Sequence, residues 1–576
     1  MSTDLRKSPY NLDEEAVAWV EETIAGMSDE EKVGQLFVNL GRSTDEAYID
    51  ELVNKYHIGG ARFTETDAAK ILKQNETYQR MSRIPMFIAA NCEEGGSGAS
   101  RQGTKVATQA QCGATDSTEA AYELGRIGAK EAAALGCNWI FGPMADIVFN
   151  WRNTLVNTRS FGMDADTVLE MTRAALRGAH ESNVITAVKH FPGDGVEERD
   201  QHLVLGVNDL SVEEWEASFG KVYRTLINEG LESIMVGHFA FPAYTKKCNP
   251  NVAPQDILPA SLAPELVNGL LRTELGFQGL VITDASHMGG MIGARPRREQ
   301  VQGAIAAGCD MFLFLHNPAE DIGYMLDGYR NGVITEERMQ DALMHILGMK
   351  AKLGLHRDRG DFDEKNLAVV GCEEHHSIAA QIADRSITLV KDNEHILPLN
   401  PSEKKRARLY YLEMAPMSAA DGTDPAKYIV KEELEKVGFT VDLNESYYEL
   451  EAKEHSPLNK FRIMDKPTVE EFKSRYDVVF VFVNMTGFAQ ENNVRVKYSA
   501  AFSNELPWWT RDVPTVFVSL NYTNHLYDLT MARTYINAYG ATRECIRATV
   551  EKMVGKSEFC GRYNENVWCG RWDTRL

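Results

Sequence analysis

The sequence predicts an α/β protein: a (β/α)8 TIM barrel followed by a three-layer α/β/α sandwich domain. Three observations lead to this fold class. The chain has 576 residues, whereas a single core stops growing at about 250–300. Short apolar runs alternate with longer amphipathic segments up to residue 355, and a charged segment then separates them from a second α/β pattern. We place the barrel at 11–356, a linker at 357–374 and the sandwich at 375–576.

The barrel prediction rests on eight apolar runs, which are continuous rather than alternating, as in parallel strands buried on both faces. They are residues 34–40, 60–64, 85–91, 137–142, 184–190, 233–238, 279–284 and 309–316. Helical segments lie between most of them, for example 118–135, 167–182 and 212–229. A strand followed by a helix, repeated in this way, indicates a closed barrel. An open doubly wound sheet is the alternative, but it rarely reaches eight regular units.

The second domain begins after a charged segment, 356–365, that is almost without apolar side chains and is typical of a linker. A helix is expected over 375–386 and another over 425–437. The expected strands are 408–412, 478–483, 515–519 and 534–538. Few strands with intervening helices predict a sandwich.

The composition narrows the classes of partner and compartment. Lys and Arg number 61 against 83 Asp and Glu, for a formal net charge of −22, and 44% of residues are hydrophobic. This excludes collagen-like and disordered chains, and so acidic a surface is expected to bind neither nucleic acid nor membrane. No secretory signal or membrane helix is visible, and the nine scattered cysteines contain no CxxC pair. We expect a cytoplasmic protein with reduced thiols; the sequence leaves a homodimer open.

Polar side chains stand at the carboxyl ends of several predicted strands. Barrel active sites form on that face, so the pattern favours an enzyme, although a single strand-end imidazole is more often structural. The residues are Asn91, Lys189, His190, His238, Asp284 and His316.

The densest polar cluster is the loop 189–202, which leaves a predicted strand and contains two glycines and a proline. Lys189 and His190 offer donors to hydroxyls or a carboxylate. Asp200 and His202 lie two residues apart, so the carboxylate can orient the imidazole and raise its basicity. A solvated loop with a chance Asp-x-His pair is equally compatible with the spacing. Zinc binding by His190, Asp200 and His202 is a third, weaker alternative.

The second cluster is the segment 276–288, in which Asp284 ends a buried strand. Such a carboxylate must be solvated at the barrel mouth or paired, and either environment suits a nucleophile that attacks an electrophilic carbon. A helix-capping role for Asp284 remains open.

With these two motifs the chain resembles the retaining family 3 glycoside hydrolases, particularly their β-N-acetylglucosaminidase branch. The resemblance rests on Lys-His-Phe-Pro-Gly at 189–193 with Asp-x-His at 200–202, and on Gly-Phe-x-Gly-x-Val-x-Thr-Asp-x-x-x-Met at 276–288. It covers the barrel and is weaker over the second domain. Longer members of the family have a barrel followed by an α/β sandwich.

The resemblance implies roles for single residues. Asp284 corresponds to the nucleophile that forms the glycosyl-enzyme, His202 to a histidine acid/base, and Asp200 to its dyad partner. The implied function is that of a retaining, exo-acting β-N-acetylhexosaminidase that removes terminal β-linked GlcNAc from glycans or from peptidoglycan or chitin fragments, without cofactor or metal. The implied substrate-binding residues are Asn91, Arg159, Lys189, His190, His238 and Met288.

Two departures from the branch keep alternatives open. Asn91 stands where the branch carries Asp, and Pro192-Gly-Asp-Gly195 replaces Pro-Gly-His-Gly. The latter is closer to a glucan-cleaving branch, a β-glucosidase type, whose acid/base is a Glu of the second domain; Glu491 is the candidate here. A β-N-acetylglucosaminide phosphorylase is another alternative, because a neutral imidazole repels phosphate less than a carboxylate does. The last alternative is a sugar-binding protein without catalytic activity, and the presence of Asp284 argues against it.

Overall fold

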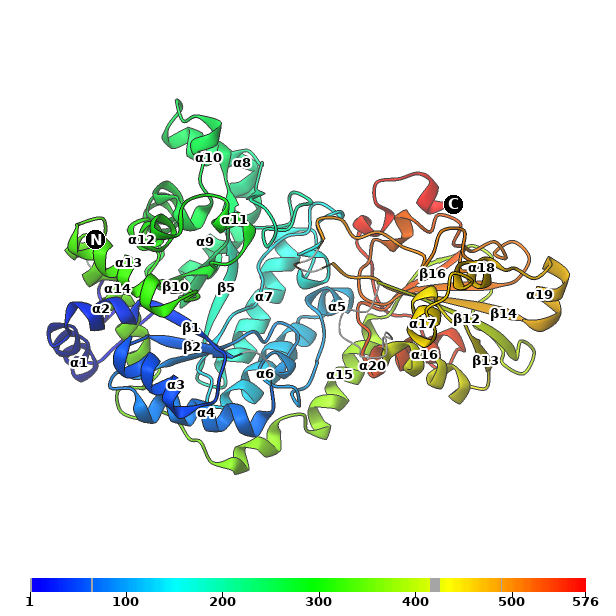
Figure 1. Cartoon of the computed structure of the whole chain (residues 1–576), viewed down its shortest axis with the longest axis horizontal. Coiled ribbons are helices and arrows are strands. Elements are labelled where there is room, and N and C mark those ends of the chain that lie inside the picture. Colours follow the sequence, from blue (N-terminus) through cyan, green and yellow to red (C-terminus); the bar gives the residue numbers. More distant parts are fainter. Residues whose placement is uncertain (1–2, 64–65, 415–424, 488, 490) are drawn as a thin grey trace. The chain divides into compact units, whose positions relative to one another are not determined.

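The computed structural model describes residues 3–63, 66–414, 425–487, 489 and 491–576 (Figure 1). The chain divides into two units, one containing Met1–Val106 and Thr118–His376 and the other containing Ala107–Ser117 and Ser377–Leu576. Residues 357–374 therefore group with the first unit, where Glu364–Val369 form a 3-10 helix. Helix α5 (Gln109–Ala114) groups with the second unit, although it lies far from that unit in the sequence.

The first unit is a closed eight-stranded barrel, and this prediction is confirmed. The strands follow the order β1-β10-β9-β7-β5-β4-β3-β2, and every pair is parallel. Each of the eight predicted runs overlaps one strand of the barrel. The strands are β1 (Phe37–Gly41), β2 (Gly60–Phe63), β3 (Phe87–Ala90), β4 (Trp139–Ile140), β5 (Ile185–Phe191), β7 (Ser233–Val236), β9 (Leu280–Ala285) and β10 (Met311–Leu313).

The first strand begins later than expected because a helix occupies the start of its apolar run. Helix α2 (Asp29–Gln35) is fixed by a capping box, in which the Ser28 side chain and the Glu31 side chain each bond the other residue's backbone. The apolar residues Val33 and Leu36 are fully buried, but only the run from Phe37 onward pairs in the sheet. The apolar run therefore indicates which residues are buried. The strand begins only after the capped helix α2 has ended.

Amphipathic helices follow the strands of this unit, as the sequence predicts. Helices α6 (Thr118–Ala134) and α7 (Ala165–His180) pack against each other. The segment expected as one helix over 212–229 consists of α8 (Val212–Trp215), a π-helical turn (Glu216–Gly220) and α9 (Lys221–Asn228). None of the described helices has both the length and the apolar character needed to cross a membrane.

The second unit contains a six-stranded sheet in the order β11-β16-β15-β14-β12-β13, in which only the β11–β16 pair is antiparallel. Four strands were expected; the pattern gave no sign of the two edge strands, which are short and carry polar residues. One apolar core includes residues of α16 (Pro425–Lys436) and α20 (Arg543–Met553), and a second includes Phe472 of α19 (Val469–Arg475). The strands are β11 (Thr388–Asp392), β12 (Arg406–Glu413), β13 (Thr440–Leu443), β14 (Val478–Asn484), β15 (Thr515–Ser519) and β16 (Thr534–Asn537).

Candidate active site

Asp284 lies near the end of β9 at the carboxyl face of the barrel. Its side chain is 13% exposed, and its Oδ1 accepts a 2.6 Å hydrogen bond from the amide of Ala285. Its Oδ2 lies 3.3 Å from Nε2 of Gln201 and 3.7 Å from Nε2 of His190. Burial alone would raise the pKa of this carboxyl, but the neighbouring imidazoles of His190, His238 and His202 lower it to about 2. Asp284 is therefore ionised at neutral pH and held by donors.

His190, at the end of β5, is oriented by a second buried carboxylate. Its Nδ1 donates to Oδ2 of Asp146 at 2.7 Å, and its amide donates to the other oxygen at 3.2 Å. Asp146 is fully buried and also accepts the amide of Asp194 at 2.7 Å. This fixes the ring so that its remaining nitrogen faces Asp284.

His238 follows β7 and is fully buried beside the same strand end. Its Nε2 donates to the carbonyl of Ala285 at 3.1 Å, so its Nδ1 accepts from the hydroxyl of Ser261 at 2.8 Å. Gln201 joins it to the nucleophile candidate, because Gln201 accepts the amide of His238 at 2.7 Å while donating to Asp284. Burial lowers the pKa of His238, and the charge of Asp284 opposes that effect.

The Asp200–His202 pair has the geometry that the spacing indicated. Nδ1 of His202 donates to Oδ1 of Asp200 at 2.7 Å, and the amide of His202 donates to the same oxygen at 2.8 Å. Asp200 is fully buried, whereas the side chain of His202 is 22% exposed. The buried carboxylate fixes the tautomer, which leaves Nε2 as the nitrogen that can exchange a proton.

Two glycines shape the loop that carries this pair. Gly193 has φ 125° and Gly195 has φ 103°, a region that other residues rarely adopt. A Cβ on Gly195 would lie 2.1 Å from the carbonyl oxygen of Ile147, and one on Gly193 would meet the ring of Phe219 at 2.2 Å. The loop can therefore pack this closely only with glycine at both positions.

Arg159 and Lys189 come together, but around a carboxylate that the sequence analysis did not single out. Glu93, three residues after β3, binds Arg159 through two bonds of 2.7 and 2.9 Å and also pairs with Nζ of Lys189. Burial would raise the pKa of Glu93, but the two cations hold it well below its usual range. Burial lowers the pKa of Lys189, and Glu93 opposes that effect. The two cations that were expected to bind the sugar are therefore paired with Glu93. The carboxylate oxygens of Glu93 can themselves accept hydrogen bonds from hydroxyls.

The remaining candidates on the barrel differ in their surroundings. Asn91 directly follows β3, and its Oδ1 is buried with no hydrogen-bond partner among the described residues. Met288 is 1% exposed and precedes the short helix α11 (Gly289–Ile292). His316 lies on the exposed surface, and its amide donates to Asp321. Of these three, Asn91 has a buried acceptor atom without a partner in the described residues, and its role in substrate binding stays a prediction.

Glu491 lies in the second unit, in the segment between β14 and β15. Its carboxylate pairs with Nζ of Lys497 at 3.1 Å, and its side chain is 32% exposed. That environment is typical of a partly exposed ion pair.

Sequence reasoning missed three residues of the barrel site: Glu93, Asp146 and Gln201. Glu93 lies two residues past Asn91, so the strand-end pattern could have found it by extending into the following loop. Asp146 comes six residues after β4 ends, beyond the reach of that pattern. Gln201 stands between the two residues of the predicted dyad, and only the folded loop shows that its side chain bridges Asp284 and His238.

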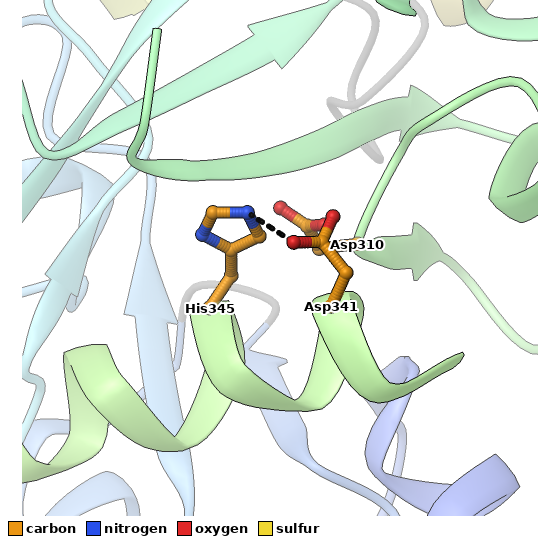
Figure 2. Close-up of side chains that lie close together, drawn as sticks. All are labelled: Asp310, Asp341 and His345. Atoms are coloured by element: carbon orange, nitrogen blue, oxygen red, sulfur yellow. Dashed lines mark ion pairs between the residues drawn. The ribbon is translucent and has the colours of Figure 1, made fainter. Parts of the chain in front are cut away.

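A cluster of metal-type ligands occurs elsewhere in the barrel unit. In the described part of the chain, the one group with ligand atoms close enough for a shared ion is Asp310, Asp341 and His345 (Figure 2). Asp310 already pairs with Arg272 at 2.6 Å and with Arg338, which also binds Asp341. Asp310 precedes β10, at the barrel face opposite to Asp284, so this is a structural ion-pair network. The zinc alternative at His190, Asp200 and His202 is not supported by the described residues.

Comparisons with known proteins show which proteins the chain is similar to. The model of the glycosyl hydrolase family 3 N-terminal domain matches residues 28–349. A beta-N-acetylglucosaminidase/beta-glucosidase of Cellulomonas fimi is 38% identical over 573 residues, which is 100% of both chains. Beta-hexosaminidase A of Pseudoalteromonas piscicida is 28% identical over 384 residues, 61% of this chain and 62% of that protein. Among solved structures, the beta-glucoside phosphorylase BglX is 34% identical, with a TM-score of 0.90 and coverage of 99% of each chain.

Proposed function

Because the chain belongs to glycosyl hydrolase family 3, we propose that it is a retaining, exo-acting β-glycosidase that removes terminal β-linked N-acetylglucosamine and also accepts β-glucosides. The observation that carries the proposal is the ionised, donor-bound carboxylate of Asp284 beside His190 and Gln201. The full-length similarity to the Cellulomonas fimi protein, whose name covers both activities, supports the sugar class.

In the first step Asp284 attacks C1 of the terminal sugar while protonated His202 gives a proton to the departing oxygen. In the second step an acceptor attacks C1, and the bond between C1 and Asp284 breaks. The low pKa of Asp284 makes its carboxylate a good leaving group in that step. The carboxylate of Glu93, whose side chain is 14% exposed, offers acceptor oxygens that suit the hydroxyls of a neutral sugar.

His202→Ala tests the acid/base assignment. For a glycoside with an alkyl or sugar leaving group, kcat/KM is expected to fall about 10²–10⁴-fold, because an unactivated oxygen needs the proton. For the p-nitrophenyl glycoside the loss in the glycosylation step should be much smaller, since p-nitrophenolate leaves unassisted. Glu491→Gln is the matched comparison and should change neither rate by more than about threefold. The opposite pattern would assign the acid/base to Glu491 and favour the β-glucosidase type.

The position of Asp284 among imidazoles predicts the acid limb of the pH profile. A pKa of about 2 keeps the carboxylate ionised, so its protonation should not reduce kcat/KM above about pH 4. His190→Asn removes an imidazole that lowers the pKa of Asp284, so the protonation of Asp284 should then begin at higher pH. We expect the acid limb of kcat/KM to shift upward in that variant, whatever its absolute rate. An unshifted limb would show that His190 does not stabilise the ionised nucleophile.

Phosphorolysis is the second candidate function. The similarity to a beta-glucoside phosphorylase over 99% of both chains favours it. Phosphate would then take the place of water in the second step, and the product would be a sugar 1-phosphate. Turnover of p-nitrophenyl β-N-acetylglucosaminide and β-glucoside, with and without phosphate, separates the two candidates through the product.

A further inference from the structure

Gln201 stands between the two residues of the Asp200–His202 pair, but its side chain bonds to two other segments of the barrel mouth. It is fully buried. Its Oε1 accepts the amide of His238 at 2.7 Å, and its Nε2 lies 3.3 Å from Oδ2 of Asp284. A backbone amide can only donate, so Oε1 must face His238, and the NH2 group is left to donate to Asp284. The orientation of this side-chain amide is therefore fixed by its neighbours.

The backbone at Gln201 joins the segment of the proposed acid/base to the segment that follows the proposed nucleophile. The amide of Gly290 donates to the carbonyl of Gln201 at 3.0 Å, and the amide of Gly289 donates to the carbonyl of His202 at 2.7 Å. A Cβ on Gly289 would lie 2.2 Å from the carbonyl oxygen of Leu203, so this close approach requires glycine. The two segments are therefore hydrogen-bonded to each other on either side of the Gln201 side chain.

Both carboxylate oxygens of Asp284 accept hydrogen bonds. The amide of Ala285 donates to Oδ1 at 2.6 Å, and Gln201 donates to Oδ2. A hydrogen bond to an ionised carboxylate is stronger than one to a neutral group, because the charge strengthens it. In the glycosyl-enzyme Asp284 is a neutral ester, so the same donor binds it less tightly. The NH2 group of Gln201 therefore favours the free carboxylate over the ester.

We propose, on the basis of the double-displacement function above, that Gln201 is a positioning residue that accelerates the breakdown of the glycosyl-enzyme by donating to Asp284. In hydrolysis the oxygen of water forms the new bond to C1, and a proton of that water passes to Nε2 of His202. The bond between C1 and the Asp284 oxygen breaks, and its electron pair returns to the carboxylate. Gln201 stabilises the negative charge that develops there.

The two steps of the reaction should respond differently to the loss of this donor. In the first step the carboxylate of Asp284 loses its charge, so a donor that favours the charged form gives no advantage. In the second step the charge returns, and the donor lowers the barrier. Removing the NH2 group should therefore slow the second step far more than the first. A residue that only maintains the shape of the site would affect both steps alike.

The test measures the formation and the breakdown of a trapped glycosyl-enzyme separately. The wild type and the variants Gln201→Met, Gln201→Glu and Gln79→Met are inactivated with 2-deoxy-2-fluoro-β-glucosyl fluoride at about pH 8, where carboxyl groups are ionised. After removal of the reagent, the return of activity towards p-nitrophenyl β-glucoside is followed. Both steps give first-order rate constants, which do not depend on how much of a variant is folded.

Gln79, in α4 (Ala68–Met81), is the matched control. It is 2% exposed, and its side chain binds the amide and the carbonyl of Met86 at 3.1 and 2.9 Å. Like Gln201, it is a buried glutamine whose side-chain amide is used at both ends, but neither of its partners belongs to the candidate site. Gln79→Met should therefore match the wild type within about twofold in both rate constants.

Gln201→Met should slow reactivation about tenfold or more, while the rate constant of inactivation changes by less than about threefold. Gln201→Glu keeps an oxygen that can accept the amide of His238 but replaces the donor with a second carboxylate. It should therefore reactivate no faster than Gln201→Met.

Reactivation of Gln201→Met at the wild-type rate, or equal slowing of its inactivation and reactivation, would overturn the proposal. Wild-type reactivation of Gln201→Glu beside slow reactivation of Gln201→Met would also overturn it, by assigning the effect to the bond with His238. These outcomes leave the double-displacement function intact. A wild type that turns over neither the β-N-acetylglucosaminide nor the β-glucoside would overturn the proposed function itself.

Discussion

Replacing Asp284 with asparagine is expected to lower kcat for p-nitrophenyl β-N-acetylglucosaminide by about 10⁴-fold or more. Asparagine preserves the shape of the side chain but cannot form the glycosyl ester, so both steps of the reaction lose their covalent intermediate. The Ala285 amide and Gln201, which hold the carboxylate, remain in place. The rate of p-nitrophenol release, measured under saturating substrate, gives the effect directly.

Asp310→Asn is the control for this variant. Asp310 is also a buried aspartate of the barrel, but it belongs to an ion-pair network away from the site. It should lower the stability of the protein more than the turnover of the correctly folded fraction. A residual kcat of Asp284→Asn within about tenfold of the wild type would contradict the nucleophile assignment.

Glu93→Gln is expected to cost about 3 kcal/mol of unfolding free energy, because it leaves two largely buried cations without their anion. The side chain of Lys189 is 3% exposed and that of Arg159 is 18% exposed, so water compensates little. The shift of the urea midpoint for barrel unfolding measures the loss. The same variant should raise KM for the sugar, since Glu93 presents its oxygens at the barrel mouth.

Glu51→Gln serves as the control, because it breaks an exposed i,i+4 pair with Lys55 and should change stability by less than about 0.5 kcal/mol. Adding Lys189→Met to Glu93→Gln removes one of the two cations that lose their carboxylate partner. The double variant should therefore lose less unfolding free energy than the sum of the losses in the two single variants. Stability of Glu93→Gln equal to that of the wild type would show that the cations find other partners.

The barrel was predictable because each strand is buried on both faces and therefore leaves a continuous apolar run in the sequence. Helix capping, as at Ser28, makes a strand begin later than predicted but does not change the order of helices and strands. The edge strands β11 and β13 could not be found in this way, since each contains only two apolar residues among polar ones. The grouping of 107–117 with the second unit is a tertiary property with no local pattern.

The candidate site was predictable in its residues but not in its pairings. The Asp-x-His spacing at 200–202 predicts the observed hydrogen bond, because two residues is the reach of an aspartate to a following imidazole. Arg159 and Lys189, however, were expected to bind the substrate, and the structure pairs both with Glu93, which the sequence analysis did not single out. Arg62, whose buried Nε has no hydrogen-bond partner in the described residues, lies inside a predicted strand, where sequence patterns indicate only burial.

The central claim, a glycosyl-enzyme on Asp284, is tested most directly by trapping it. The protein is incubated with 2-deoxy-2-fluoro-β-glucosyl fluoride, digested with trypsin and mapped by mass spectrometry. We expect one fluoroglucosyl group on the peptide 273–297, with fragmentation placing it on Asp284 rather than on Glu274. A label on Glu93, Asp200 or any other residue, or no label on an enzyme that turns over β-glucosides, would contradict the account.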